Sequence, residues 1–258
     1  MSSKFMGDFT VVDNTQVASS YALLKLSPVE SQNLAEVFLP GQFVQIATPD
    51  NATYLRRPIS VCYIDEDDNT LWLLVRRAGA GSNAICDTAA GSRLNLLYPL
   101  GNGFSASQHK ERCLLIGGGV GVAPLLYLGA QLDKAGFNPT FLLGARSEKD
   151  VLLFEEFSKH GDTYISTEDG TSGEKGLVTT NSILTSDFDR IYCCGPMPMM
   201  KAVARIARQR GINCEVSLEN VMACGVGACL CCVEKTVKGN LCVCQDGPVF
   251  NINMLTWE

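Results

Sequence analysis

The sequence of 258 residues lacks the features of several protein classes. No apolar run reaches the roughly 20 residues that a membrane-spanning helix needs. The N-terminal segment MSSKFMGDFTVVDN has no apolar core long enough for a signal peptide, so we expect a cytoplasmic protein. Acidic residues outnumber basic ones and the net charge is −6, which disfavours nucleic acid and anionic membranes as partners.

Histidine is scarce, and neither of the two histidines is assigned a role. His109 lies in a predicted linker and His160 at the end of a predicted helix. Hydrophobic residues make up 46% of the chain and charged residues 19%, as in an ordinary globular protein of one to two domains. No internal repeat and no low-complexity segment occurs.

Cysteine, by contrast, is abundant, with 12 residues. Half of them are scattered through apolar segments, where a free thiol packs as a small apolar side chain: Cys62, Cys86, Cys113, Cys193, Cys194 and Cys214. The other half fall within residues 224–244. In a reducing cytoplasm, clustered thiols more often hold metal than form disulfides, so this segment predicts a metal site.

The pattern of strand-like, helical and glycine-rich segments changes twice along the chain and predicts three domains. Residues 1–104 contain short alternating segments separated by turn residues, which suggests an antiparallel β-barrel or sandwich. Residues 105–218 alternate strands with helical segments at 122–136, 148–161 and 197–211, which predicts a parallel sheet covered on both faces. Residues 219–258 are rich in glycine and too short for a core of their own without a cross-link. A hairpin with its turn at 238–240 is expected there.

A glycine loop follows the first strand of the central domain, in the sequence LLIGGGVGVAP at 114–124. Gly117, Gly119 and Gly121 would let the backbone approach a phosphate, and the following helix offers free N–H groups. The loop departs from the strict G-x-G-x-x-G pattern and could be only a tight strand–helix turn. A second loop, YCCGPMPMM, follows a later strand, and the carboxyl ends of parallel strands bind ligands. Together the two loops predict a nucleotide site.

Arginines in the N-terminal domain predict an anion site. LRRPISV places two arginines before a proline, and guanidinium groups form paired hydrogen bonds to phosphate oxygens. We interpret them as a clamp for a flavin pyrophosphate, although solvated surface charge would look the same. LLVRRAGAGSN adds Arg76 and a glycine turn with Ser82 as a second possible anion site.

Three hypotheses compete for the cysteine cluster. Disulfides are disfavoured by the expected compartment. Zinc could be held by Cys229 and Cys232 with Cys242 and Cys244. The spacing Cys224-x₄-Cys229-x₂-Cys232 is instead that of plant-type [2Fe–2S] sites, which need one more distant cysteine. The small residues of CGVGAC can turn backbone N–H groups toward sulfur, so we favour the iron–sulfur cluster.

These motifs together resemble the ferredoxin–NAD(P)⁺ reductase superfamily, through PGQF (40–43), RPIS (57–60), GGGVGVAP (117–124), GARS (144–147) and CGP (194–196). With the C-terminal SLENVMACGVGACLCCVE and VCQDGPVF, the whole chain resembles the family of electron-transfer subunits of dihydroorotate dehydrogenase B. The resemblance implies an FAD-binding β-barrel (1–104), an NAD-binding α/β domain (105–218) and a small [2Fe–2S] domain (219–258).

The resemblance also implies site residues. FAD contacts fall on Arg57, Pro58, Ile59, Ser60, Leu74, Val75, Arg76, Gly81 and Ser82. NAD⁺ contacts fall on Gly117, Gly118, Gly119, Gly121, Cys194, Gly195 and Pro196, with Cys194 near the nicotinamide. The cluster ligands fall on Cys224, Cys229, Cys232 and Cys244. Cys231 and Cys242 are left over, which departs from the family pattern. An acidic turn, EDG at 168–170, would repel a 2′-phosphate and favours NAD⁺ over NADP⁺.

By this resemblance the chain is an oxidoreductase subunit of de novo pyrimidine biosynthesis. A partner chain would oxidise dihydroorotate to orotate on FMN, and electrons would pass through the cluster and FAD to NAD⁺. The expected assembly is a hetero-oligomer with two chains of each kind, and no proton-abstracting residue is expected here. Two alternatives stay open: the FAD- and cluster-bearing subunit of a ferredoxin–NADP⁺ or sulfide-type oxidoreductase, and a non-redox zinc-binding module.

Overall fold

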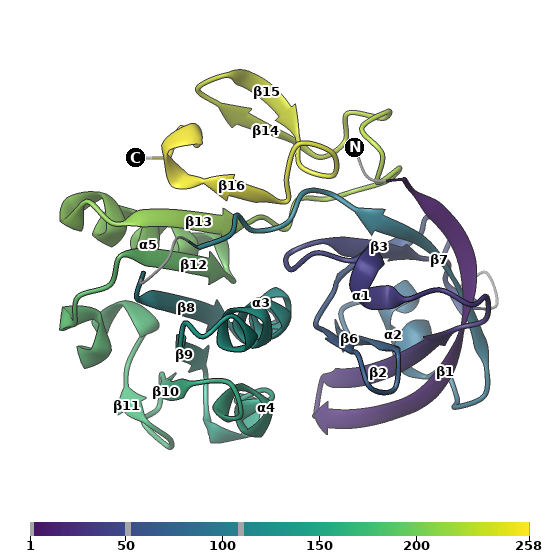
Figure 1. Cartoon of the computed structure of the whole chain (residues 1–258), viewed down its shortest axis with the longest axis horizontal. Helices are drawn as coiled ribbons and strands as arrows, with labels where there is room; N and C mark the ends of the chain where they lie inside the picture. The colour runs from purple at the N-terminus through teal and green to yellow at the C-terminus, as the bar shows by residue number, and fades with distance from the viewer. Residues whose placement is uncertain (1–2, 50–52, 108–110, 258) are drawn as a thin grey trace. The chain divides into compact units, whose positions relative to one another are not determined.

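The computed structural model describes residues 3–49, 53–107 and 111–257 (Figure 1). His109 lies outside the described residues. The chain divides into two compact units. The first contains Met1–Gly103, Glu219–Glu234 and Asn240–Pro248, and the second contains Phe104–Leu218, Lys235–Gly239 and Val249–Glu258. The cysteine-rich segment therefore belongs mostly to the first unit, together with the N-terminal strands.

The first unit is built on an antiparallel half-barrel of seven strands in the order β4-β3-β7-β1-β2-β6-β5. The strands are β1 (Phe5–Ala18), β2 (Tyr21–Pro28), β3 (Phe43–Ile46), β4 (Arg57–Ser60), β5 (Tyr63–Asp65), β6 (Thr70–Arg76) and β7 (Arg93–Leu100). Short helices α1 (Leu34–Val37) and α2 (Ala80–Cys86) connect them. Alternating apolar residues supply the core, where Tyr98 packs against Phe5, Phe9 and Phe38.

The second unit contains a seven-stranded sheet in the order β11-β10-β9-β8-β12-β13-β16. Its strands are β8 (Cys113–Gly118), β9 (Thr140–Ala145), β10 (Asp162–Thr167), β11 (Glu174–Lys175), β12 (Arg190–Cys194), β13 (Asn213–Ser217) and β16 (Val249–Asn251). All pairs are parallel except β13 with β16. The helices α3 (Ala123–Lys134), α4 (Phe154–Ser158) and α5 (Met197–Arg210) pack on the sheet. The order in which strands are added reverses between β8 and β12, and sheets of this kind bind ligands at the carboxyl ends of the strands at such a switch point.

Three local predictions differ from the structure. The helix expected over 148–161 is reduced to α4 and a preceding 3₁₀ turn, because Leu153 takes a left-handed conformation with φ of 57°. The glycine turn at Ser82 is the start of α2, where the Ser82 hydroxyl accepts hydrogen bonds from two backbone N–H groups. The expected hairpin is present as β14 (Val233–Thr236) and β15 (Gly239–Cys242), so its turn lies one residue earlier, at 237–238.

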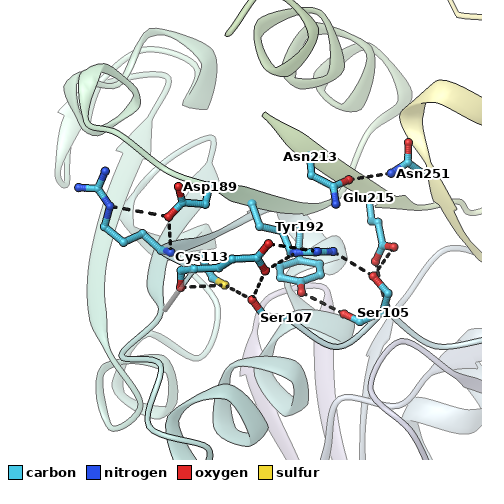
Figure 2. Close-up of polar contacts among 11 residues, drawn as sticks. Ser105, Ser107, Cys113, Asp189, Tyr192, Asn213, Glu215 and Asn251 are labelled. Atoms are coloured by element: carbon cyan, nitrogen blue, oxygen red, sulfur yellow. Dashed lines mark hydrogen bonds and ion pairs between the residues drawn. The ribbon is translucent and has the colours of Figure 1, made fainter. Parts of the chain in front are cut away.

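A buried polar network anchors the start of the second unit to its sheet (Figure 2). The Arg190 side chain, on β12, is 7% exposed and pairs with Glu111 at 2.9 Å. It also donates to the Ser105 hydroxyl at 3.0 Å, and Ser105 donates to Glu215 on β13 at 2.6 Å. The Tyr192 hydroxyl donates to the Ser105 carbonyl, and burial raises the pKa of Tyr192 far above its usual range. These bonds fix Ser105 and Glu111 against β12 and β13. In the described part of the chain, no helix has the length and apolarity to cross a membrane.

Candidate functional site

The cysteine-rich loop of the first unit turns backbone N–H groups toward sulfur. The N–H groups of Val226 and Cys229 each donate to Cys224 Sγ at 3.4 Å. The Gly227 N–H donates to Cys244 Sγ at 3.1 Å, and the Cys244 N–H donates to Cys232 Sγ at 3.3 Å. Burial acts to raise the pKa of Cys224, but these hydrogen bonds outweigh it and lower that pKa to about 6. The loop therefore favours thiolate at one of its predicted ligands.

Two glycines make this loop possible. Gly225 has φ of 72° and Gly227 has φ of 80°, the left-handed conformation that a residue with a Cβ rarely adopts. A Cβ on Gly225 would lie 2.9 Å from Gln45 Nε2, and one on Gly227 would collide with the Gln245 side chain. Both glycines are thus required where the loop packs against its neighbours.

The thiols sort into two kinds of environment. The structure links Cys224 with Cys229 and Cys232 with Cys244 through contacts between their side chains. Cys231 is exposed, as is the predicted ligand Cys229, so exposure alone does not separate the spare thiol from the ligands. The Cys242 thiol lies 3.9 Å from the Gly227 carbonyl rather than accepting an N–H group. Among the residues described, no three His, Cys, Asp or Glu side chains are arranged around a single-ion position.

The segment that carries Cys244 is bound to the end of the barrel strand β7. Asn102 donates through Nδ2 to the carbonyls of Gln245 and Asp246, each at 3.0 Å, and its N–H donates to the Gly247 carbonyl at 2.6 Å. A Cβ on Gly101 would lie 2.5 Å from Pro248. The thiol loop and the half-barrel therefore form one packed body.

This arrangement fits a [2Fe–2S] cluster. Such a cluster needs two thiolates for each of two irons and N–H groups directed at its sulfurs. The four predicted ligands lie in two linked pairs, and the loop carries N–H groups directed at three of them. The assignment of Cys224, Cys229, Cys232 and Cys244 as ligands stays a prediction that this geometry suits.

The two arginines of the predicted flavin clamp have different environments. Arg56 is tied to the barrel, since its Nη2 donates to Asn95 Oδ1 at 2.6 Å and its Nη1 to the Asn95 carbonyl at 2.9 Å. Among the described residues, the Arg57 guanidinium donates hydrogen bonds to two neighbouring carbonyls of its own segment, those of Leu55 and Arg56. Its guanidinium passes over Gly81, where a Cβ would lie 2.6 Å from Nε. Arg57 is therefore the arginine whose charge stays available for a phosphate.

The other residues predicted to bind FAD lie close to this arginine in the fold. Pro58, Ile59 and Ser60 continue β4, and all are half-buried. Leu74 and Val75 are buried in β6, whereas Arg76 is exposed at its end. Ser82 lies in the first turn of α2. The glycine cradle beside Arg57 fits a pyrophosphate, and these contacts stay a prediction.

The glycine loop and the CGP turn of the second unit are in contact. Cys194 pairs with Gly117 across β12 and β8. A Cβ on Gly121 would lie 2.6 Å from the Cys194 carbonyl and from Gly195 Cα. Gly119 has φ of 56°, which turns the chain into α3. The structure thus brings the two predicted nucleotide loops together at the crevice between β8 and β12.

Their neighbours complete the crevice. A Cβ on Gly118 would lie 3.2 Å from Pro196 and 2.6 Å from Met199 Sδ. The Cys194 side chain is buried. These close approaches fit a backbone-lined nucleotide site, and the individual NAD⁺ contacts stay predictions.

Solved structures share this fold. The NADH-dependent reduced ferredoxin–NADP oxidoreductase, known from work on flavin-based electron bifurcation, matches 96% of this chain and 90% of its own at 27% identity, with a TM-score of 0.85. The ferredoxin reductase of carbazole 1,9a-dioxygenase matches 81% of this chain and 67% of its own at 20% identity, with a TM-score of 0.69. The predicted fold class is confirmed.

Two family models match the chain: an oxidoreductase NAD-binding domain over residues 115–205, and the iron–sulfur cluster binding domain of dihydroorotate dehydrogenase B over residues 219–256. Fold and site together define an oxidoreductase of the ferredoxin reductase type.

Curated relatives named dihydroorotate dehydrogenase B (NAD⁺), electron transfer subunit, are 39% identical to this chain. The match to the relative from Fusobacterium nucleatum covers 94% of this chain and 95% of the relative. The match to the relative from Shouchella clausii covers 96% of this chain and 97% of the relative. The chain belongs to this family of electron transfer subunits. Membership confirms the predicted cofactors, FAD, [2Fe–2S] and NAD⁺.

Sequence reasoning missed one residue near the site. Gln45, on β3, is fully buried, and its amide contacts the thiol loop at Gly225. The only signal in the sequence is a polar residue within the apolar strand FVQI, which by itself points to no ligand.

Proposed function

We propose that this chain passes electrons from a dihydroorotate-oxidising partner to NAD⁺ in de novo pyrimidine synthesis. One observation carries the proposal: the cysteine-rich loop directs backbone N–H groups at cysteine sulfurs and packs on the half-barrel that bears Arg57. One compact unit thus carries the residues predicted to bind both a one-electron and a two-electron centre. The partner's FMN, an assembly with two chains of each kind, and a cytoplasmic location are parts of the same proposal.

The residues of this chain would bind and orient the cofactors. FAD interconverts one- and two-electron transfer when bound, and the cluster carries single electrons. Arg57 would hold the flavin pyrophosphate, and Pro58, Ile59 and Ser60 would provide further FAD contacts along β4. Leu74 and Val75 have buried side chains, so they would contact FAD through their backbone. No residue of this chain is assigned a proton-abstracting role.

The second unit would present NAD⁺ for hydride transfer. The backbone of Gly117, Gly118, Gly119 and Gly121 would accommodate its pyrophosphate, with Cys194, Gly195 and Pro196 lining the nicotinamide side. The turn with Glu168 and Asp169 follows β10, and Asp169 accepts two hydrogen bonds from Thr171, at 2.7 and 3.0 Å. These bonds lower the pKa of the exposed Asp169 carboxyl, so it stays charged and disfavours a 2′-phosphate.

Anaerobic purification of the full chain tests the proposal. The expected protein is brown-yellow and contains one flavin, with about two irons and two acid-labile sulfides per chain. Co-expression with a dihydroorotate-oxidising FMN subunit should yield a complex that reduces NAD⁺ with dihydroorotate. Stoichiometric zinc without flavin would overturn the proposal in favour of a non-redox zinc module.

A second candidate is the small subunit of a ferredoxin–NADP⁺ oxidoreductase, favoured by the TM-score of 0.85 to such an enzyme. The two candidates differ in the electron donor, not in the cofactors. Reduction of NADP⁺ by ferredoxin, with no activity alongside the FMN subunit, would favour this second candidate.

A further inference from the structure

Two buried glutamines, Gln42 just before β3 and Gln45 within it, have opposite hydrogen-bonding states. Gln42, just before the strand, is 3% exposed; its Nε2 donates to the Gly101 carbonyl at 2.9 Å and its Oε1 accepts from the Leu39 N–H at 2.8 Å. Gln45 is 0% exposed, yet neither Nε2 nor Oε1 has a partner in the part of the chain that the structure describes. A buried amide left without partners is unfavourable, because it has lost its hydrogen bonds to water, so such a residue needs an explanation.

The position of Gln45 supplies one. Its side chain lies against the backbone of Gly225, the residue that follows the predicted ligand Cys224. A Cβ on Gly225 would meet Nε2, Cγ and Cδ of Gln45 at 2.9, 3.0 and 3.2 Å, so the whole amide faces this part of the loop. The glycine is therefore needed to let Gln45 approach the thiol site.

Gln45 also neighbours the predicted flavin segment. It pairs with Pro58 across β3 and β4, and Phe43 pairs with Ser60 two residues away. Side chains of directly paired residues in an antiparallel sheet project to the same face. Gln45 thus lies between the RPIS strand and the thiol loop, within one unit of the molecule.

We propose that Gln45 donates a hydrogen bond to a sulfur of the bound [2Fe–2S] cluster and raises its reduction potential; this inference rests on the proposed function. Cluster and thiolate sulfurs are acceptors only, and a carboxamide turned toward them presents its N–H groups. A donor at this place stabilises the extra negative charge of the reduced cluster, and such hydrogen bonds are among the factors that set cluster potentials.

The experiment replaces Gln45 by methionine, which keeps the volume and removes the donors. The matched control is Gln42→Met, in a glutamine whose hydrogen bonds are all made within the barrel. Both proteins are purified anaerobically, and the cluster potential is measured by EPR-monitored redox titration. The flavin potential is measured by absorbance in the same samples.

Gln45→Met should shift the cluster potential to lower values and change the EPR signal, while the flavin potential stays where it is. Gln42→Met should leave both potentials unchanged and lower the melting temperature. The cluster-free Gln45→Met chain should melt no lower than the cluster-free wild type, since it loses no internal hydrogen bond. A loaded Gln45→Met protein with an unchanged cluster potential overturns the inference, as does a shift confined to the flavin.

Two further arms keep the test decisive. Gln45→Leu also removes the donors and should likewise lower the cluster potential, so it is measured if the methionine variant does not take up the cluster. In wild-type protein, the Gln45 amide is labelled with ¹⁵N through glutamine and with deuterium by exchange into heavy water. Pulsed EPR should then detect coupling of the amide nitrogen and of its exchangeable hydrogens to the cluster. Lack of a coupling that depends on Gln45 overturns the inference. A wild-type chain without iron and sulfide would instead overturn the proposed function.

Discussion

Cys231 and Cys232 are neighbours in the chain and lie in opposite environments. The Cys232 side chain is buried, and its Sγ accepts the Cys244 N–H at 3.3 Å, whereas Cys231 is exposed. The backbone before them explains the difference, because Leu230 has φ of 59° and reverses the chain there. This relationship favours Cys232 over Cys231 as the predicted cluster ligand.

Cys231→Ser should keep the cluster, and Cys232→Ser should lose or badly perturb it. Each variant exchanges one thiol for a hydroxyl at adjacent positions, so each variant is the matched control for the other. Iron and acid-labile sulfide per chain, with the visible spectrum, provide the measurement. If the results are reversed, the ligand assignment is displaced by one residue.

Gly81→Ala should weaken FAD binding. The new Cβ would lie 2.6 Å from Arg57 Nε and 3.1 Å from a Thr48 methyl group, so the guanidinium has to move from its present place. We expect a loss of roughly tenfold or more in FAD affinity, equivalent to about 1.4 kcal/mol. Flavin content after dialysis and titration of the flavin-free chain would measure it.

Gly79→Ala is the control for this variant, since a Cβ at Gly79 has nothing within 4 Å among the described residues. It tests whether any extra methyl group near α2 has the same effect. Equal loss of FAD in both variants would contradict the role given to Arg57.

Gly121→Ala should raise the KM for NADH with little change in FAD or iron content. Its Cβ would lie 2.6 Å from the Cys194 carbonyl and force the glycine loop away from the CGP turn. NADH oxidation with ferricyanide as acceptor reports this step without the partner chain. Lys134→Ala, at the other end of α3, is the control and should behave as wild type; an unchanged KM in Gly121→Ala would exclude the loop from the nucleotide site.

Arg190→Leu should destabilise the second unit. It leaves the half-buried Glu111 without this cation and removes the donor to Ser105; breaking a fully buried pair costs about 3–5 kcal/mol, and we expect the lower end of that range or less here. Arg112→Leu breaks only exposed pairs with Asp187 and Asp189, which are worth about 0–1 kcal/mol. Denaturant unfolding of the two variants compares them; equal losses of unfolding free energy would refute the anchoring role of the network in Figure 2.

Much of the fold could be predicted because its elements carry local signals. The helix over 197–211 ends at Gly211, which takes the left-handed conformation that closes a helix. The helix over 148–161 could not be predicted correctly, because its apolar spacing is helical while Leu153 breaks the backbone in the folded chain. Strand β16 carries too few residues for a periodic signal, and only its pairing with β13 makes it a strand.

The sequence by itself determined the chemistry of the candidate sites. Three patterns carry that chemistry: the spacing of Cys224, Cys229 and Cys232, the glycine loop after β8, and the RPIS segment. Each lies within a short stretch of sequence, so it can be recognised without knowledge of the fold. Tertiary structure alone decided which thiols are buried, which arginine is tied to Asn95, and that Gln45 faces the thiol loop. Those properties depend on residues far apart in sequence that meet only when the barrel and the C-terminal segment pack together.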